Sequence, residues 1–260
     1  MKIATWNING IKARLEGLVA WLKEAEPDIV CLQELKSVDE NVPAGDIEGL
    51  GYNLAIHGQK SFNGVALLSR LPLEDVKSGL PGDPDDDQAR FIEGVVSTGD
   101  GAVRIACAYM PNGNPVDSPK LDYKLEWMER LQKWAEARLA LEEPLVLAGD
   151  YNIIPEPHDA KNPDAWIGDA LFLPESRQAY RRLVAAGFTD AVRAVVHDKD
   201  IYTFWDYQAG AWQKNNGIRI DHLLLSPEAA DTLVAAGIDK HVRAWEKPSD
   251  HVPVWIDLSL

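Results

Sequence analysis

The chain has 260 residues, of which 46% are hydrophobic and 26% are charged, and its formal net charge at pH 7 is -15. These proportions are ordinary for a globular protein with a core of normal depth, arranged as one large domain or two modest ones. The negative charge argues against a broad basic surface for non-specific nucleic-acid binding, because Lys and Arg contacts to phosphates supply most of that affinity. A local basic patch, or a metal bound in an acidic cleft, is still compatible with it.

The two cysteines and the N-terminal segment indicate where the protein works. Cys31 and Cys107 lie in apolar runs without CxxC spacing, which is typical of core thiols in a reducing compartment. The first residues, "MKIATWNING", contain neither a long apolar stretch nor a signal-peptide cleavage site, and no run of 18 apolar residues is present. We therefore expect a cytoplasmic protein with no membrane partner.

The first half of the chain alternates apolar strands with one amphipathic helix. Leu15, Leu18, Val19 and Leu22 follow the spacing i, i+3, i+4, i+7, which predicts a helix that ends near Pro27. Apolar runs bounded by Gly, Pro and Asp clusters predict strands at 2–7, 28–34, 64–70, 90–98 and 103–110.

The second half continues this alternation. Ser118 and Pro119 predict a helix start, and its apolar stripe continues to Leu139. The remaining predicted elements are a strand at 144–152, a loop at 155–174, a helix at 175–186, a strand at 217–226, a helix at 227–237 and a strand at 252–258. Pro253 places the last strand at the edge of a sheet. The alternation predicts mixed sheets with helices outside.

Polar side chains stand at the ends of most of these predicted strands. They are Asn7, Glu34, Tyr109, Asn112, Asp150, Asn152, Asp221, Asp250 and His251. Bringing so many polar groups together is costly unless they satisfy one another or hold something charged. Their number indicates a functional site.

The residue types suit metal-assisted cleavage of a phosphodiester. Glu34, supported by Asn7, offers oxygen ligands for a hard cation such as Mg²⁺. His251, next to Asp250, can stay protonated and meet a phosphate oxygen, and Asp150 could orient or deprotonate a water for in-line attack. The sequence contains no His/Cys cluster with zinc spacing and no GxSxG, P-loop or GxGxxG motif after a strand.

Eight motifs in order resemble the exonuclease III family of abasic-site endonucleases. They are "WNINGIKAR", "LQELK", "HGQKSFNGVALLSR", "AYMPNG", "GDYNI", "YTFWDY", "RIDHLLLS" and "EKPSDHVPVW". Together they span essentially the whole chain. The resemblance implies a single domain over residues 1–260 with an α+β fold of the deoxyribonuclease I type. This fold is a four-layer αββα sandwich, in which two packed mixed sheets are flanked by helices and the site lies at one end between the sheets.

The resemblance also implies a role for each matched residue. Glu34 matches the metal ligand and Asn7 its support, and Asp250 matches a further carboxylate near the metal. Asp150 matches the residue thought to activate the water, with His251 or the metal alone as alternatives, and Asn152 lies beside it. Asp150 and Asn152 are both expected close to the metal. Asp221 matches the partner that orients His251. Tyr109 and Asn112 match groups near the phosphate. Mg²⁺ is the expected cofactor, with Mn²⁺ as the alternative.

Other residues are expected to contact the substrate. Phe204 and Trp205 match an aromatic wall for a flipped-out abasic sugar. Lys60, Arg90, Lys214 and Arg219 are the cations nearest to the motifs, and we expect phosphate contacts among them. One position departs from some relatives, because Asn9 stands where they carry aspartate. This departure puts a direct metal role for position 9 in doubt.

The expected protein is a DNA repair nuclease. It would hydrolyse the phosphodiester 5′ to an abasic site, with 3′→5′ exonuclease, 3′-phosphatase and 3′-phosphodiesterase activity on duplex DNA, and its partner would be duplex DNA with abasic sites or blocked 3′ ends. We expect a monomer. The alternative is a phosphatase or phosphodiesterase of the same fold that acts on lipid or inositol phosphates. It would share Glu34, Asp150, Asn152 and the Asp250–His251 pair but would leave "HGQK", "YMPNG" and the aromatic pocket unexplained.

Overall fold

The computed structural model describes residues 1–99 and 101–260. Its strands are β1 (Lys2–Asn7), β2 (Ile29–Gln33), β3 (Asn53–His57), β4 (Val65–Ser69), β5 (Leu73–Ser78), β6 (Phe91–Ser97), β7 (Ala102–Tyr109), β8 (Leu145–Asp150), β9 (Thr189–Asp190), β10 (Asp221–Leu225), β11 (Leu233–Ile238) and β12 (Val254–Leu258). Its α-helices are α1 (Leu15–Ala25), α2 (Ala44–Glu48), α3 (Pro119–Leu139), α4 (Pro174–Ala185), α5 (Ala191–Val195) and α6 (Pro227–Ala230).

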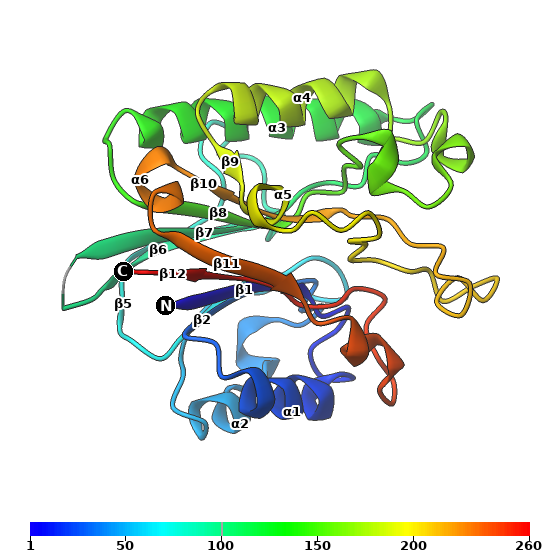
Figure 1. Ribbon diagram of the computed structural model, residues 1–260. Helices are drawn as coiled ribbons and strands as arrows, with labels where there is room; N and C mark the ends of the chain where they lie inside the picture. Colours follow the sequence, from blue (N-terminus) through cyan, green and yellow to red (C-terminus); the bar gives the residue numbers. More distant parts are fainter. Residues whose placement is uncertain (100) are drawn as a thin grey trace.

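The strands form two six-stranded mixed sheets. The first sheet has the order β11-β12-β1-β2-β4-β3 and the second the order β5-β6-β7-β8-β10-β9. The sheets are stacked, with α1 and α2 outside the first and α3 and α4 outside the second (Figure 1). The predicted four-layer αββα sandwich is therefore confirmed.

Alternation along the strands separates three layers of core. Ile3 in β1 lies between the sheets with Cys31 and Val146, whereas its neighbour Ala4 packs outward in the cluster that holds Trp21 of α1. Successive side chains of a strand point to opposite faces, so one strand can serve both layers. Each fully buried aliphatic side chain contributes about 1.5–3 kcal/mol relative to an exposed one.

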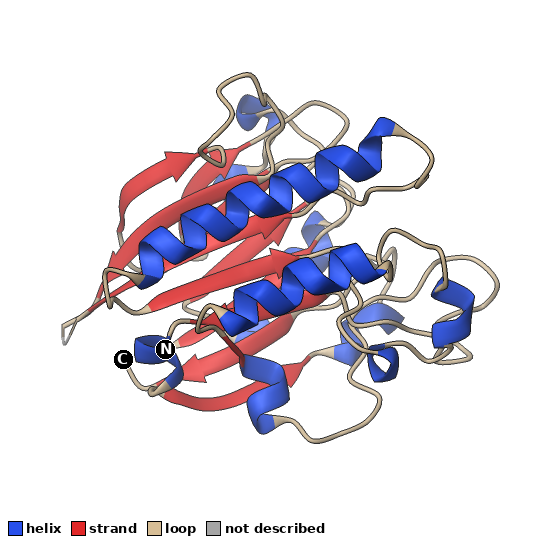
Figure 2. Cartoon of the chain, turned by 90° about the horizontal axis from the view of Figure 1, so that it is seen from above, coloured by secondary structure: helices blue, strands red, loops and turns tan. Residues whose placement is uncertain are grey.

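Helix α3 illustrates how local signals and packing agree. The Ser118 side chain accepts a hydrogen bond from the backbone amide of Lys120, and Pro119 occupies the first helical position, as predicted. Trp127 and Leu131 are buried on its inner face, in one cluster with Leu147 of β8. The two long helices α3 and α4 lie side by side across the strands (Figure 2).

Two predictions near the C-terminus were wrong. The predicted helix 227–237 ends at Ala230, and β11 follows it and pairs antiparallel with β12. As a result β12 lies between β11 and β1 and is not an edge strand. Pro253 lies just before the strand begins, so its missing amide does not interrupt the pairing. The run "LVAAGI" resembles a helix because Ala favours helices, and pairing with the edge of β12 overrode that preference.

The sheets bring the ends of six strands together at one end of the molecule, the site edge. The parallel pair β1 and β2 ends there, as does the parallel pair β7 and β8. Strands β10 and β12 run antiparallel to β8 and β1, so they begin at this same edge. It lies opposite the end of the molecule that holds both termini (Figure 1). Nearly every polar residue selected from the sequence is attached to one of these strand ends.

Candidate active site

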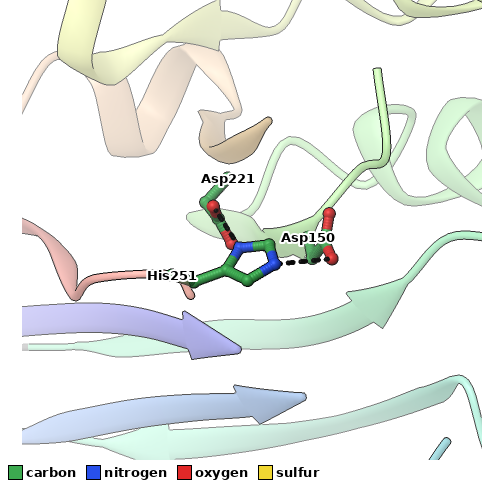
Figure 3. A group of neighbouring side chains, drawn as sticks. All are labelled: Asp150, Asp221 and His251. Atoms are coloured by element: carbon green, nitrogen blue, oxygen red, sulfur yellow. Dashed lines mark hydrogen bonds and ion pairs between the residues drawn. The ribbon is translucent and has the colours of Figure 1, made fainter. Parts of the chain in front are cut away.

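A buried histidine lies between two carboxylates at this edge. His251 Nδ1 is 2.8 Å from Asp221 Oδ2, and His251 Nε2 is 3.8 Å from Asp150 Oδ2 (Figure 3). Asp150 ends β8, Asp221 begins β10, and the two residues are direct partners in the sheet register. The pairing of β8 with β10 therefore sets the spacing of the carboxylates that hold the imidazole.

The three groups shift one another's protonation. Burial alone would lower the pKa of His251, but the carboxylates of Asp221 and Asp150 raise it to about 10. Burial raises the pKa of Asp150 to about 7, and the nearby His251 opposes that rise. A histidine enclosed in this way presents a positive charge at neutral pH, which suits contact with a phosphate oxygen.

Thr203 completes this arrangement and was not selected from the sequence. Its hydroxyl donates to Asp221 Oδ2 over 2.6 Å and accepts from the backbone amides of Ile220 and Asp221. Phe204 follows it, with its ring centroid 4.9 Å from that of His251. The motif "YTFWDY" contained the signal for Thr203, but only the aromatic residues of that motif were assigned a role.

Glu34 is the second acidic centre of the site. Asn7 Nδ2 donates to both Glu34 Oε1 and Asp150 Oδ2, at 3.1 and 2.9 Å, so one amide joins the ends of the two sheets. The Tyr109 hydroxyl donates to Glu34 Oε1 over 2.7 Å. Lys36 Nζ lies 2.7 Å from Glu34 Oε2. Burial would raise the pKa of Glu34, but Lys36, Tyr109 and Asn7 together lower it, so the carboxylate is ionised.

The oxygen donors of this centre fit a hard divalent cation. Asn9 links Asn7 to Asp250, because its backbone amide donates to Asn7 Oδ1 over 3.0 Å and its Nδ2 donates to Asp250 Oδ1 over 2.9 Å. Lys36 donates to Asn9 Oδ1, so one ammonium bridges the Glu34 and Asn9 side chains. Carboxylate and amide oxygens are the ligand types that Mg²⁺ prefers.

A metal-ligand geometry also exists among Asp150, Asp221 and His251. Within the described residues, one ligand atom from each lies within 4.8 Å of the others. Both imidazole nitrogens face carboxylates, Nδ1 at 2.8 Å from Asp221 and Nε2 at 3.8 Å from Asp150, so His251 is less suited than Glu34 to donate to a metal. The Glu34 side therefore fits a cation better than the histidine side.

Two asparagines line the adjoining surface. Asn152 donates from its backbone amide to Asp150 Oδ1 over 2.9 Å and from Nδ2 to the carbonyl of Met110. Its side-chain oxygen accepts from Asn112 Nδ2 at 3.1 Å. Asn112 and Arg90 line one pocket of about 410 Å³. The guanidinium of Arg90 lies 4.8 Å from the centre of the Tyr109 ring.

The structure corrects two of the predicted substrate contacts. Arg219 is buried, with its guanidinium paired to Asp159 at 2.7 Å and Asp190 at 2.8 Å, so it cannot reach a phosphate. Trp205 has no exposed surface and packs edge-on against Trp212, so it is a core residue and not a wall of the substrate site. Of the other predicted cations, Lys60 and Lys214 are both exposed.

Comparison with known proteins identifies the family. Residues 4–251 match the Endonuclease/Exonuclease/phosphatase family. The chain belongs to this family. Exodeoxyribonuclease III of Haemophilus influenzae is 36% identical to it, over 99% of each chain. Two solved structures cover 100% of both chains. An AP endonuclease from Archaeoglobus fulgidus is 36% identical with a TM-score of 0.94, and a Neisseria 3′ phosphatase bound to a product DNA hairpin is 38% identical with a TM-score of 0.95.

This family membership confirms the resemblance drawn from the eight motifs. The full-length match to exodeoxyribonuclease III and the AP endonuclease structure agree with the branch of the Endonuclease/Exonuclease/phosphatase family expected from those motifs. Among the residues that the structure describes, no helix is long and apolar enough to cross a membrane.

Proposed function

We propose that this chain hydrolyses the DNA phosphodiester bond 5′ to an abasic site and leaves a 3′-hydroxyl end. The observation that carries the proposal is the Asp221–His251–Asp150 array, which Asn7 joins to Glu34. At the coarser level of a hydrolytic DNA repair nuclease, the sequence-based prediction is confirmed by the relatives. The 3′→5′ exonuclease, 3′-phosphatase and 3′-phosphodiesterase activities belong to the same proposal.

The proposed reaction is an in-line attack of water on phosphorus. The bond from the water oxygen to phosphorus forms, the bond from phosphorus to the upstream O3′ breaks, and that oxygen takes a proton from a solvent water and leaves as a hydroxyl. Asp150 orients the water and takes its proton. His251, held in place by Asp221, donates a charged hydrogen bond to a phosphate oxygen, and Asn152 and Asn112 donate from their amides. Tyr109 donates to Glu34 and keeps its ring beside the phosphate position.

A divalent cation would complete the charge balance. Glu34, Asn7 and Asp250 would hold it, with Asp150 and Asn152 next to them, and Mg²⁺ is the proposed ion, with Mn²⁺ as the alternative. When bound, it would stabilise the negative charge that develops on the phosphate oxygens. The Lys36 ammonium beside Glu34 supports this placement, because it shows that the carboxylate attracts a positive charge.

The substrate surface is proposed from exposed groups around this site. Phe204 would form the wall for the abasic sugar, because its ring lies next to His251. Lys60, Arg90 and Lys214 would contact DNA phosphates. We also propose one catalytic domain over residues 1–260, since both sheets contribute side chains to a single site. This domain is proposed to act as a monomer in the cytoplasm. The lipid or inositol phosphatase alternative gains no support from relatives named as exodeoxyribonuclease or AP endonuclease.

The test is incision of a labelled duplex that carries one abasic site, with Mg²⁺ and with EDTA. The wild-type chain should cut on the 5′ side only with the cation. Asp150→Asn and His251→Ala should each reduce turnover by roughly 100- to 10,000-fold while duplex binding stays nearly unchanged. Glu129→Gln, an exposed change on α3, is the matched control and should cut normally.

Two other results of this experiment would change the proposal. Trimming of intact 3′ ends without incision would replace the proposal with a dedicated exonuclease. Near-normal turnover of Asp150→Asn would remove Asp150 from the chemistry.

A further inference from the structure

A buried lysine, Lys124, lies behind the active site and contacts its loops through their backbone. Lys124 lies on α3, on the same inner stripe as Trp127, Met128 and Leu131, and has no exposed surface. An ammonium on the apolar face of a helix is costly unless all its donors find partners. Its presence there needs a reason beyond packing.

The ammonium group of Lys124 binds three backbone carbonyls. Its Nζ donates to the oxygens of Asn152 at 2.6 Å, Asn112 at 3.0 Å and Ala170 at 3.3 Å. An ammonium has three N–H donors and no acceptor, so three carbonyls satisfy it completely. These carbonyls belong to three separate loops, which follow β7, β8 and the short helix at Pro163–Trp166. One side chain therefore ties three loops together.

Two of the three loops supply the amides of the active site. Asn112 Nδ2 donates to Asn152 Oδ1, and the backbone amide of Asn152 donates to Asp150. Asn152 has a φ of 48°, in the left-handed region that non-glycine residues rarely adopt. Asn tolerates this region better than most residues, and the short bond from Lys124 to its carbonyl fixes where the loop lies.

The loop around Asn112 is shaped to admit the lysine. Gly113 has a φ of +89°, and a Cβ at this position would lie 2.7 Å from Lys124 Cδ. Any larger residue would push the loop away from the lysine. Glycine at position 113 therefore keeps the Asn112 carbonyl within reach of Nζ.

We infer that Lys124 is a positioning residue that sets Asn112 and Asn152 against Asp150 from behind the site. This inference rests on the proposed function, because it assigns the two amides to the phosphate of the DNA substrate. Lys124 itself touches neither substrate nor metal. Its effect on the reaction passes through the two backbone carbonyls that it holds.

The test is Lys124→Met, which removes the ammonium and keeps most of the length of the side chain. We expect kcat for abasic-site incision to fall roughly 10- to 100-fold, the usual cost of losing a group that orients a catalytic residue, with KM changed by less than about threefold. Because part of the effect passes through Asn112, Lys124→Met should cost less in an Asn112→Ala background than in the wild-type chain. Full additivity of the two losses would overturn the inference.

The control is Ser176→Ala. The Ser176 hydroxyl also donates to the Ala170 carbonyl, at 2.6 Å, so this variant loses a buried bond to the third loop alone. It should lose stability but keep wild-type kcat. A folded Lys124→Met protein with kcat within twofold of wild type would overturn the inference. If Lys124→Met fails to fold, Gly113→Ala separates the same two groups and should show the same loss of kcat.

A second readout does not depend on DNA cleavage. In Lys124→Met the side-chain NH₂ resonances of Asn112 and Asn152 should shift or broaden in a ¹⁵N correlation spectrum, whereas in Ser176→Ala they should not. If the wild-type chain cuts no DNA, the proposed function fails and these resonances still test the positioning role. Unchanged resonances in Lys124→Met would overturn it.

Discussion

At the level of single residues, the buried Arg219 pairs with several polar side chains, among them His222. Arg219 donates to Asp159 and Asp190 and also lies 3.0 Å from His222 Nδ1. His222 Nε2 lies 3.3 Å from the carbonyl of Ile153. A neutral imidazole satisfies both contacts when Nε2 carries the proton and Nδ1 accepts from the guanidinium. A protonated ring would set two donors against each other.

This arrangement predicts a pH-dependent stability. Burial, reinforced by the charge of Arg219, lowers the pKa of His222 from 6.5 to about 4. Between those values the unfolded chain binds the proton and the folded chain does not. The neutral His222 side chain therefore makes its full contribution to the free energy of unfolding above pH 6.5. That contribution is lost as the pH falls to about 4, by on the order of 3 kcal/mol.

The measurement is the free energy of unfolding in urea from pH 4 to 7.5. His222→Gln should flatten this pH dependence, because an amide can make both contacts without titrating. His197→Gln, at an exposed position, should keep the wild-type slope. Equal slopes in all three proteins would show that His222 is not the titrating group.

At the scale of elements, the site depends on how closely β7 and β8 approach. Gly149, one residue before Asp150, faces the β7 backbone, and a Cβ there would lie 1.8 Å from the carbonyl oxygen of Ala108. The contact is with backbone atoms, so no flexible side chain could move to relieve the clash. The glycine of "GDYN" is thus required by the pairing that places Tyr109 opposite Asp150 in the register.

Gly149→Ala should therefore destabilise the protein by at least about 3 kcal/mol, the upper range for overpacking. Gly17→Ala is the matched control, because a Cβ at Gly17 in α1 meets no atom within 4 Å. That change should stabilise the protein by roughly 0.5–1 kcal/mol through higher helix propensity. Thermal and urea unfolding measure both. Comparable stability of the two variants would contradict the close approach of the strands.

At the scale of the whole molecule, an acidic protein must hold an acidic polymer. The formal net charge of -15 repels DNA at long range, so binding depends on local cations. Many cations on the outer layers are neutralised, such as Arg104 by Glu93 and Arg138 by the same carboxylate. Arg90, by contrast, lies over the Tyr109 ring at the site edge.

DNA affinity should consequently fall steeply with salt. Anisotropy of a labelled abasic duplex between 50 and 200 mM salt should give a linear plot of log K against log salt concentration. Arg90→Gln should lower its slope by about one, the loss of one phosphate contact. Lys133→Gln, exposed on α3, should leave the slope unchanged. A flat response in the wild-type chain would mean that phosphate contacts do not hold the DNA.

Much of this protein could be predicted from local patterns. The strand that ends in Asp150, the capped helix from Pro119 and the family resemblance depend on neighbouring residues or on ordered motifs, and the structure agrees with each. The pairing of β11 was not predictable in this way. A short Ala-rich run favours a helix by its own propensity, and pairing with the open edge of β12 overrode that preference.

The sequence by itself determined which chemical groups this protein has and at which strand ends they stand. Tertiary structure alone decided which of them meet. Arg219 was expected at the substrate and is buried in ion pairs, whereas Lys124 lies on the apolar stripe of a helix and holds two active-site loops. The position of a residue close to a motif in the sequence does not show where its side chain points. Packing between elements that are distant in the chain sets that direction.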